Sequence, residues 1–174
     1  EDLPTAYRNY YRSYFPRFAR HATRLATVSE YSRRDIATTY GVPEARIDVV
    51  HNGVGDVFAP LSEAEKDMAR KEFTQGAPYI SCVGSLHPRK NIARLLLAFD
   101  ELLRNHPSDL RLLIVGESFW WDARMKEAYN GMTHKDRVVF TGRLGQDKLK
   151  LAMGGSLALA FVSYFEGFGI PVAE

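Results

Sequence analysis

The sequence predicts an α/β fold in which a parallel sheet is covered by helices on both faces. Segments typical of strands alternate with segments typical of helices along most of the 174 residues. The strand segments are unbroken apolar runs, such as Tyr79 to Val83, instead of the two-residue alternation of a half-exposed strand. A hydrophobic fraction of 45% is ordinary for a globular protein, so the chain can bury a core.

The first 21 residues combine aromatic side chains with arginines. Pro16 interrupts this segment, so we expect two short helices or one kinked helix. An aromatic and basic helix can lie on an anionic membrane surface, which would be a peripheral contact. Alternatively, it packs on the rest of a domain whose first part precedes this chain, and we favour this second interpretation.

Three elements are expected next: a strand at 24–29, a helix at 31–40 that Gly41 ends, and a strand at 47–51. Asn52 and Gly53 then form a turn signal, and helical periodicity is absent as far as Pro60. We therefore predict a domain boundary here. Residues 1–56 would be the end of one domain, and residues 57–174 a second domain.

The second domain alternates helices and strands. Ser62 and Glu65 predict a capping box for its first helix, and Asn91 can cap a strongly amphipathic one. The expected helices are 62–73, 92–105, one from about residue 121, and 146–153, and the expected strands are 79–83, 110–115, 138–141 and 157–162. This order predicts a Rossmann-like parallel sheet that lacks its C-terminal elements.

Charge and composition exclude several classes of protein. A formal net charge of +2 is too small and too evenly spread for a nucleic-acid-binding protein. Cys82 is the only cysteine, so neither a disulfide framework nor a cysteine-based metal site is expected, and its apolar neighbours predict a core position. Because no apolar run could span a bilayer and no signal peptide is visible, we expect a cytoplasmic protein, free or at the inner face of the membrane.

The loop after Val83 is the first candidate site, because ligands of parallel sheets bind beyond the carboxyl ends of the strands. It places Arg89 and Lys90 beside the N-terminus of a predicted helix. Cations normally favour the other end of a helix, so this placement indicates a phosphate or diphosphate between them. A solvated basic pair is the plainer alternative. The glycine spacings of a Walker loop and of a dinucleotide fingerprint are absent.

Two further loops are candidates. Gly116 follows the strand at 110–115 and would allow a close backbone approach, although a plain turn is an alternative. Glu166 and Glu174 lie at the two ends of the last turn, where they could hold a polyhydroxylated ligand at two places. Pro171 fits the first position of a helix, which would place Glu174 in its first turn as a ligand or as a capping residue.

Six segments, in order, resemble retaining glycosyltransferases of the GT-B fold, specifically family 4, the glycosyl transferases group 1. They are Val28 to Asp35, Val49 to Val54 with Phe58 and Pro60, Val83 to Asn91, Leu113 to Gly116, Val139 to Gly142, and the pair Glu166 and Glu174. The resemblance implies a chain that holds the end of an N-terminal acceptor domain and an incomplete C-terminal donor domain.

The resemblance further implies transfer of a hexose from a nucleotide-diphosphate sugar, GDP-mannose or a UDP-sugar, without a metal or a separate cofactor. Lys90, helped by Arg89, would neutralise the diphosphate, and Glu166 would hold the donor sugar. Many members carry an arginine at the position of Ser85, and here Arg89 is the candidate for that charge. The remaining donor-binding positions would be Glu174 on the ribose hydroxyls, with Gly84, Ser85, Gly116, Gly167, Phe168 and Gly169 around the diphosphate and sugar.

The acceptor would be a sugar, a lipid-linked sugar or a polysaccharide, in the synthesis of a surface polysaccharide or glycolipid. Two alternatives stay open at this point. The chain could be a sugar-nucleotide-binding module without transfer activity, or a sugar-nucleotide epimerase of the same fold.

Overall fold

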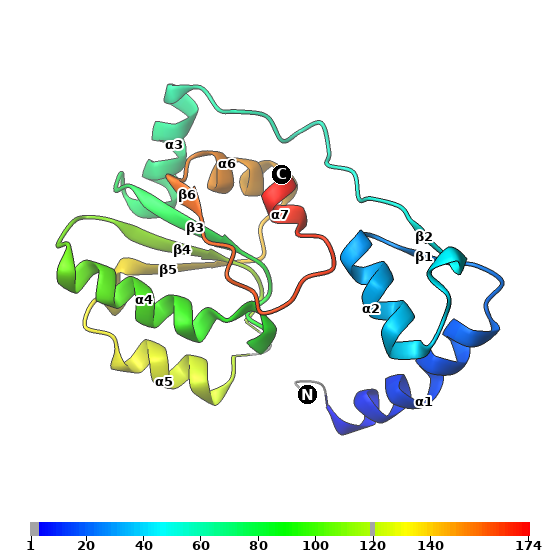
Figure 1. The fold of residues 1–174 in the computed structure, drawn as a ribbon. Coiled ribbons are helices and arrows are strands. Elements are labelled where there is room, and N and C mark those ends of the chain that lie inside the picture. Colours follow the sequence, from blue (N-terminus) through cyan, green and yellow to red (C-terminus); the bar gives the residue numbers. More distant parts are fainter. Residues whose placement is uncertain (1–3, 119–120) are drawn as a thin grey trace. The chain divides into compact units, whose positions relative to one another are not determined.

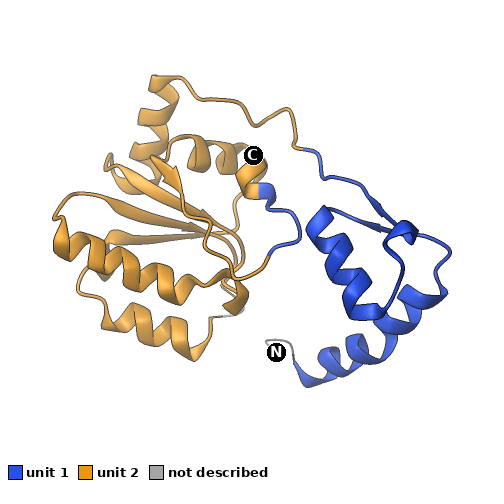
Figure 2. Cartoon of the chain, in the orientation of Figure 1, with its two compact units in different colours: residues 1–53, 166–170 blue, residues 54–165, 171–174 orange. Residues whose placement is uncertain are grey.

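A computed structural model describes residues 4–118 and 121–174, and the chain divides into two compact units (Figure 2). The smaller unit contains residues 1–53 together with the short segment 166–170. The larger unit contains residues 54–165 and 171–174. The assignment of residues 1–56 to an acceptor domain and of 57–174 to a donor domain stays a prediction.

The smaller unit is built around a pair of parallel strands and two helices (Figure 1). Pro16 lies inside a single continuous helix, so two separate helices do not form. Gly41 ends the second helix in the left-handed conformation, as predicted, with φ of 64°. Both strands are shorter than expected from the sequence. The elements are α1 (Thr5–His21), β1 (Leu25–Thr27), α2 (Glu30–Tyr40), a 3₁₀ turn (Glu44–Arg46) and β2 (Ile47–Val49).

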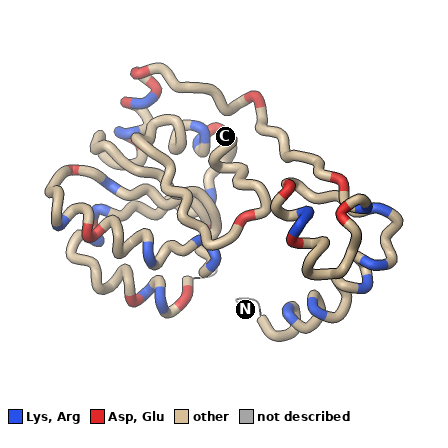
Figure 3. The backbone as a smooth tube through the Cα atoms, viewed as in Figure 1, with Lys and Arg blue, Asp and Glu red and all other residues tan. Residues whose placement is uncertain are grey.

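Helix α1 exposes much of its aromatic surface. Figure 3 shows basic but no acidic positions along it. Its exposed aromatic residues are Tyr7, Tyr10, Tyr14, Phe15 and Phe18. Among the residues that the structure describes, no helix is long and apolar enough to cross a membrane.

The larger unit contains a four-stranded parallel sheet in the order β5-β4-β3-β6. The capping box of Ser62 and Glu65 is present at the start of its first helix. The strand expected at 157–162 is limited to two residues. The elements are α3 (Glu63–Thr74), β3 (Tyr79–Val83), a 3₁₀ turn (Pro88–Lys90), α4 (Ile92–Asn105), β4 (Arg111–Val115), α5 (Ala123–Gly131), a 3₁₀ turn (Lys135–Arg137), β5 (Val138–Gly142), α6 (Gln146–Gly154), β6 (Ala158–Leu159) and α7 (Ile170–Ala173).

Helices cover both faces of this sheet, with α4 and α5 on one side and α3 and α6 on the other (Figure 1). Successive residues of β4 point to opposite faces: Leu112 and Ile114 join the cluster under α4 and α5, whereas Leu113 and Val115 join the one that contains α6. All four side chains are at most 3% exposed. The predicted doubly covered α/β sheet is therefore confirmed, and the unbroken apolar runs reflect burial on both faces.

Candidate active site

The strand order places the candidate site at a defined point of the sheet. Counted within the larger unit, the order is third, second, first, fourth, so the first strand, β3, lies between β4 and β6. The direction of winding reverses between β3 and β6. In open α/β sheets, ligands bind outside the carboxyl ends of the strands at such a reversal. The loops that follow β3, β4 and β6 carry the residues that the sequence selected, except Glu174, which follows α7.

Gly84 and Gly116 bring two of these loops into direct contact. The N–H of Gly84 donates to the carbonyl of Val115 at 2.8 Å, which continues the β3–β4 ladder beyond the strand ends. Gly116 has φ of 152°, and a Cβ atom placed on it would lie 2.0 Å from the carbonyl oxygen of Gly84. Only glycine fits there. This close approach is between two backbone segments of the chain. The approach of a ligand to the same glycines stays a prediction.

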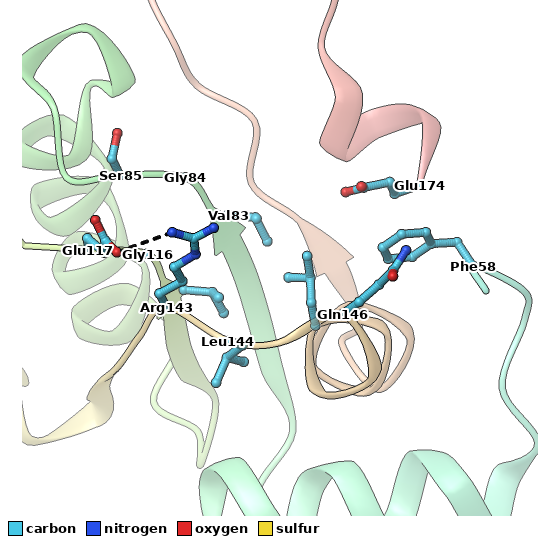
Figure 4. Close-up of a pocket in the computed structure, with 12 residues that line it drawn as sticks. Phe58, Val83, Gly84, Ser85, Gly116, Glu117, Arg143, Leu144, Gln146 and Glu174 are labelled. Atoms are coloured by element: carbon cyan, nitrogen blue, oxygen red, sulfur yellow. Dashed lines mark ion pairs between the residues drawn. The ribbon is translucent and has the colours of Figure 1, made fainter. Parts of the chain in front are cut away.

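A pocket of about 450 Å³ opens over these glycines (Figure 4). In Figure 4, Glu174 lies across the pocket from Gly84, Ser85 and Gly116. The structure thus brings together four residues that the sequence selected. The complete lining is Phe58, Val83, Gly84, Ser85, Val115, Gly116, Glu117, Arg143, Leu144, Gln146, Leu149 and Glu174.

Lys90 extends across Gly84 at the edge of this pocket. Its Cε and Nζ atoms lie 2.8 and 3.0 Å from the point where a Cβ of Gly84 would stand. The ammonium group also lies 5.8 Å from the centre of the Phe161 ring. Burial raises the pKa of the Cys82 thiol to about 11, and the nearby charge of Lys90 opposes that rise. Cys82 is buried in the core, as predicted, and the ammonium group of Lys90 lies beside Gly84, one of the residues that line the pocket.

Arg89 and Asn91 connect the loop after β3 to the loop after β6. The guanidinium of Arg89 donates to the carbonyl of Phe165 at 2.6 Å, and the N–H of Tyr164 donates to the carbonyl of Arg89 at 2.9 Å. The amide of Asn91 donates to the carbonyl of Val162 at 3.1 Å. Asn91 does occupy the N-cap position of α4, but its side chain makes no cap bond there. The side-chain cap expected from the sequence is therefore wrong, because the amide serves the neighbouring loop.

Glu174 follows α7 directly. Burial raises the pKa of its carboxyl group. Within residues 4–118 and 121–174, no group donates a hydrogen bond to this carboxylate. A partly desolvated carboxylate at a pocket wall can accept hydrogen bonds from ligand hydroxyls.

The segment from Glu166 to Gly169 belongs to the smaller unit. The carbonyl of Gly167 accepts hydrogen bonds from the hydroxyls of Ser29 and Ser32, at 2.6 and 3.2 Å. The ring of Phe168 packs edge-on against His51, with centroids 5.9 Å apart. Gly169 has φ of 98°, a conformation that favours glycine.

Sequence reasoning missed several residues that line the pocket. Arg143, which forms an ion pair with Glu117 at 3.7 Å, follows β5 and was not among the selected positions. The rule that ligands bind beyond strand ends applies to β5 as well, so a search of the loop after Gly142 would have found it. Among the described residues, no group of three or more His, Cys, Asp or Glu side chains is arranged to hold a metal ion.

Family models cover nearly the whole chain. The model described as Glycosyl transferases group 1 matches residues 63–174, and the model described as Glycosyltransferase Family 4 matches residues 2–58. The O-antigen chain mannosyltransferase B of Escherichia coli is 26% identical over 151 residues, which cover 86% of this chain and 40% of that protein. The 2-deoxystreptamine glucosyltransferase of Streptomyces kanamyceticus is 30% identical over 161 residues, which cover 89% of this chain and 40% of that enzyme.

Solved structures share the fold. The crystal structure of HepE from Anabaena, in complex with UDP and glucose, superposes with a TM-score of 0.76 at 18% sequence identity. The match covers 97% of this chain and 46% of HepE. The chain therefore spans less than half the length of these three proteins.

Proposed function

Because the chain belongs to the glycosyl transferases group 1 family and has its GT-B fold, we propose that the protein transfers a hexose from a nucleotide-diphosphate sugar. The transfer retains the configuration of the anomeric carbon, as in family 4 generally. The observation that carries the proposal is the pocket over Gly84 and Gly116, which has Lys90 at one edge and Glu174 on the opposite wall. Its volume of about 450 Å³ lies within the range of small-molecule sites.

In this proposal, different residues bind different parts of the donor. Lys90 neutralises the diphosphate, which gains negative charge as the bond to the sugar breaks. Glu174 accepts hydrogen bonds from the ribose hydroxyls. Glu166 accepts hydrogen bonds from the hydroxyls of the donor sugar. The backbone N–H groups of Gly167 to Gly169 serve the sugar-phosphate.

Arg89 has two compatible tasks in this scheme. Its guanidinium donates to Phe165, and we retain it as the helper of Lys90 because a guanidinium has five N–H donors. The candidate donors are GDP-mannose and a UDP-sugar. The HepE complex contains UDP, whereas the E. coli relative is a mannosyltransferase, which favours GDP-mannose.

The acceptor that we propose is a lipid-linked sugar or growing polysaccharide, because the E. coli relative is named for the O-antigen chain. The reaction then takes place in the cytoplasm or at the inner face of the membrane. The exposed aromatic and basic surface of α1 is the candidate for peripheral contact. We expect the full-length protein to sediment with vesicles rich in anionic lipid and not with neutral vesicles, and equal binding to both would contradict this contact.

Transfer is tested by incubating the full-length protein with a panel of GDP-, UDP- and ADP-sugars, with and without an oligosaccharide acceptor. We expect one donor to be consumed with the formation of a glycosylated product. Tight nucleotide binding without product would favour a binding module, and isomerisation of the donor without an acceptor would favour an epimerase. Calorimetry that detects no binding of any nucleoside diphosphate by the folded protein would overturn the proposal.

A further inference from the structure

Two serines at the start of α2 hold the glycine-rich segment that follows Glu166. Ser29 is the N-cap residue of α2, and Ser32 is only 8% exposed. They lie 138 and 135 residues away from Gly167 in sequence, yet both hydroxyls reach its carbonyl oxygen. Neither serine contributes to the pocket in the larger unit.

The hydrogen bonds of this group can be assigned completely. A serine hydroxyl has one hydrogen and two lone pairs. The hydrogen of Ser29 goes to Gly167, because that distance of 2.6 Å is shorter than the 3.1 Å to the Ser32 hydroxyl. The Ser29 oxygen in turn accepts the backbone N–H of Ser32 at 3.1 Å. The second lone pair of the Gly167 carbonyl then takes the hydrogen of Ser32.

This arrangement determines the direction of the next N–H group. In a planar trans peptide, the carbonyl of Gly167 and the N–H of Phe168 point in opposite directions. A carbonyl directed at the two serines therefore turns the Phe168 N–H away from them. No group in the part of the chain that the structure describes accepts from this N–H, and the Phe168 ring is held separately by His51.

We propose that Ser29 and Ser32 are positioning residues for sugar transfer, which fix the orientation of the Gly167–Phe168 peptide. The proposal rests on the proposed function, in which this segment serves the sugar-phosphate. A donor group that is already oriented needs no rearrangement as charge develops in the transition state. The serines therefore act on turnover, whereas nucleotide affinity comes from the pocket of the larger unit.

The test compares variants of the full-length protein that separate the helix cap from the contact with Gly167. Ser29→Asp keeps an oxygen that can cap α2, but it has no hydrogen for the carbonyl. Ser29→Thr keeps the hydroxyl. Ser32→Ala removes the second hydroxyl without touching the cap. Ser13→Ala, at an exposed position of α1, is the control for an unrelated serine.

We expect kcat to fall about tenfold in Ser29→Asp and about threefold in Ser32→Ala, as for the loss of one hydrogen bond. The donor KM and the affinity for the nucleoside diphosphate should stay within about twofold, because the pocket is unchanged. Ser29→Thr should retain most of the activity that Ser29→Asp loses. Amide hydrogen exchange at residues 166–170 should become faster in Ser29→Asp and not in Ser29→Thr.

Two results would overturn the proposal. Unchanged exchange in Ser29→Asp would show that the contact does not hold the segment, and faster exchange with wild-type kcat would show that holding it does not matter for transfer. If Ser29→Asp fails to fold, Ser32→Ala decides between the same outcomes. A wild-type protein that binds nucleotide but transfers no sugar would refute the proposed function instead, and would leave the exchange result as a separate measurement of the loop contact.

Discussion

The floor of the pocket and the loop beyond β6 are held in place by different kinds of contact. At the floor of the pocket, the backbones of Gly84 and Gly116 are in direct contact and extend the pairing of β3 and β4. The loop beyond β6 is tied instead by side chains, from Arg89 and Asn91 near its start and from Ser29 at Gly167. Side-chain bonds can break singly, whereas the floor moves only with the strands. In the proposed function, the nucleotide therefore binds to a preformed floor, whereas the loop assigned to the donor sugar can adjust.

The largest effect on stability and nucleotide binding is expected from adding a side chain at Gly116, on the floor of the pocket. In Gly116→Ala the new Cβ would meet the Gly84 carbonyl at 2.0 Å in a backbone conformation that alanine rarely adopts. We expect a loss of about 2–4 kcal/mol in the free energy of unfolding and the loss of nucleotide binding, measured by denaturant titration and calorimetry. Gly131→Ala is the matched control because nothing lies within 4 Å of its Cβ position. A stable Gly116→Ala protein that binds nucleotide would show that the floor is not rigid.

The next largest effect is expected from removing the charge of Lys90, whose ammonium group lies beside Gly84. In Lys90→Ala we expect kcat to fall about 10²- to 10³-fold, because the leaving diphosphate loses its counter-charge. Affinity for a nucleoside diphosphate should fall, while affinity for the nucleoside alone should be nearly unchanged. Lys126→Ala, at an exposed position of α5, controls for the general loss of a positive charge. Equal losses for nucleoside and diphosphate would contradict the role of Lys90.

Loosening the loop should have a smaller effect that is confined to turnover. Asn91 has φ of 60°, so Asn91→Gly removes the amide contact with Val162 without straining the backbone. We expect kcat to fall several-fold and the exchange of residues 162–165 to become faster, while nucleotide affinity stays constant. A matching fall in nucleotide affinity would mean that the loop and the floor are not independent.

The smallest effect concerns the opposite wall of the pocket. Burial raises the pKa of Glu174, and hydroxyl donors of a ribose favour its charged form. We therefore expect nucleoside affinity to be full above this raised pKa and to fall by a few-fold as the pH drops through it. Calorimetry over a pH series measures this, and Glu174→Gln should show a flatter profile. A wild-type profile as flat as that of the variant would exclude Glu174 from ribose binding.

The fold was predictable from the sequence because local signals agree with the tertiary structure. The apolar run in β4 and the capping box at Ser62 each depend on residues close together in the chain. The short β6 was overestimated, because the apolar run from Leu157 to Val162 continues as a loop that Asn91 holds by a side-chain bond. The spacing of apolar residues in the sequence does not predict such a hydrogen bond.

Part of the pocket lining was predictable where glycines follow strand ends, as at Gly84 and Gly116, whereas their role in binding stays a prediction. Ser29 and Ser32 carried no such signal, since their contact with Gly167 joins residues more than 130 positions apart. The prediction for Asn91 failed for a different reason. Its cap position was right, but the same side chain had a competing partner that only the three-dimensional arrangement reveals.

The buried thiol of Cys82 gives the protein a built-in reporter. It is the only thiol in the chain and lies on β3, two residues before Gly84, which forms part of the pocket floor. Alkylating reagents react with the thiolate and not with the thiol. A pKa of about 11, combined with burial, therefore keeps Cys82 unreactive while the larger unit is folded. The rate of its alkylation in the native protein therefore measures how often the centre of the larger unit opens. A nucleotide that binds the closed form should slow this reaction in proportion to its occupancy, without any introduced label.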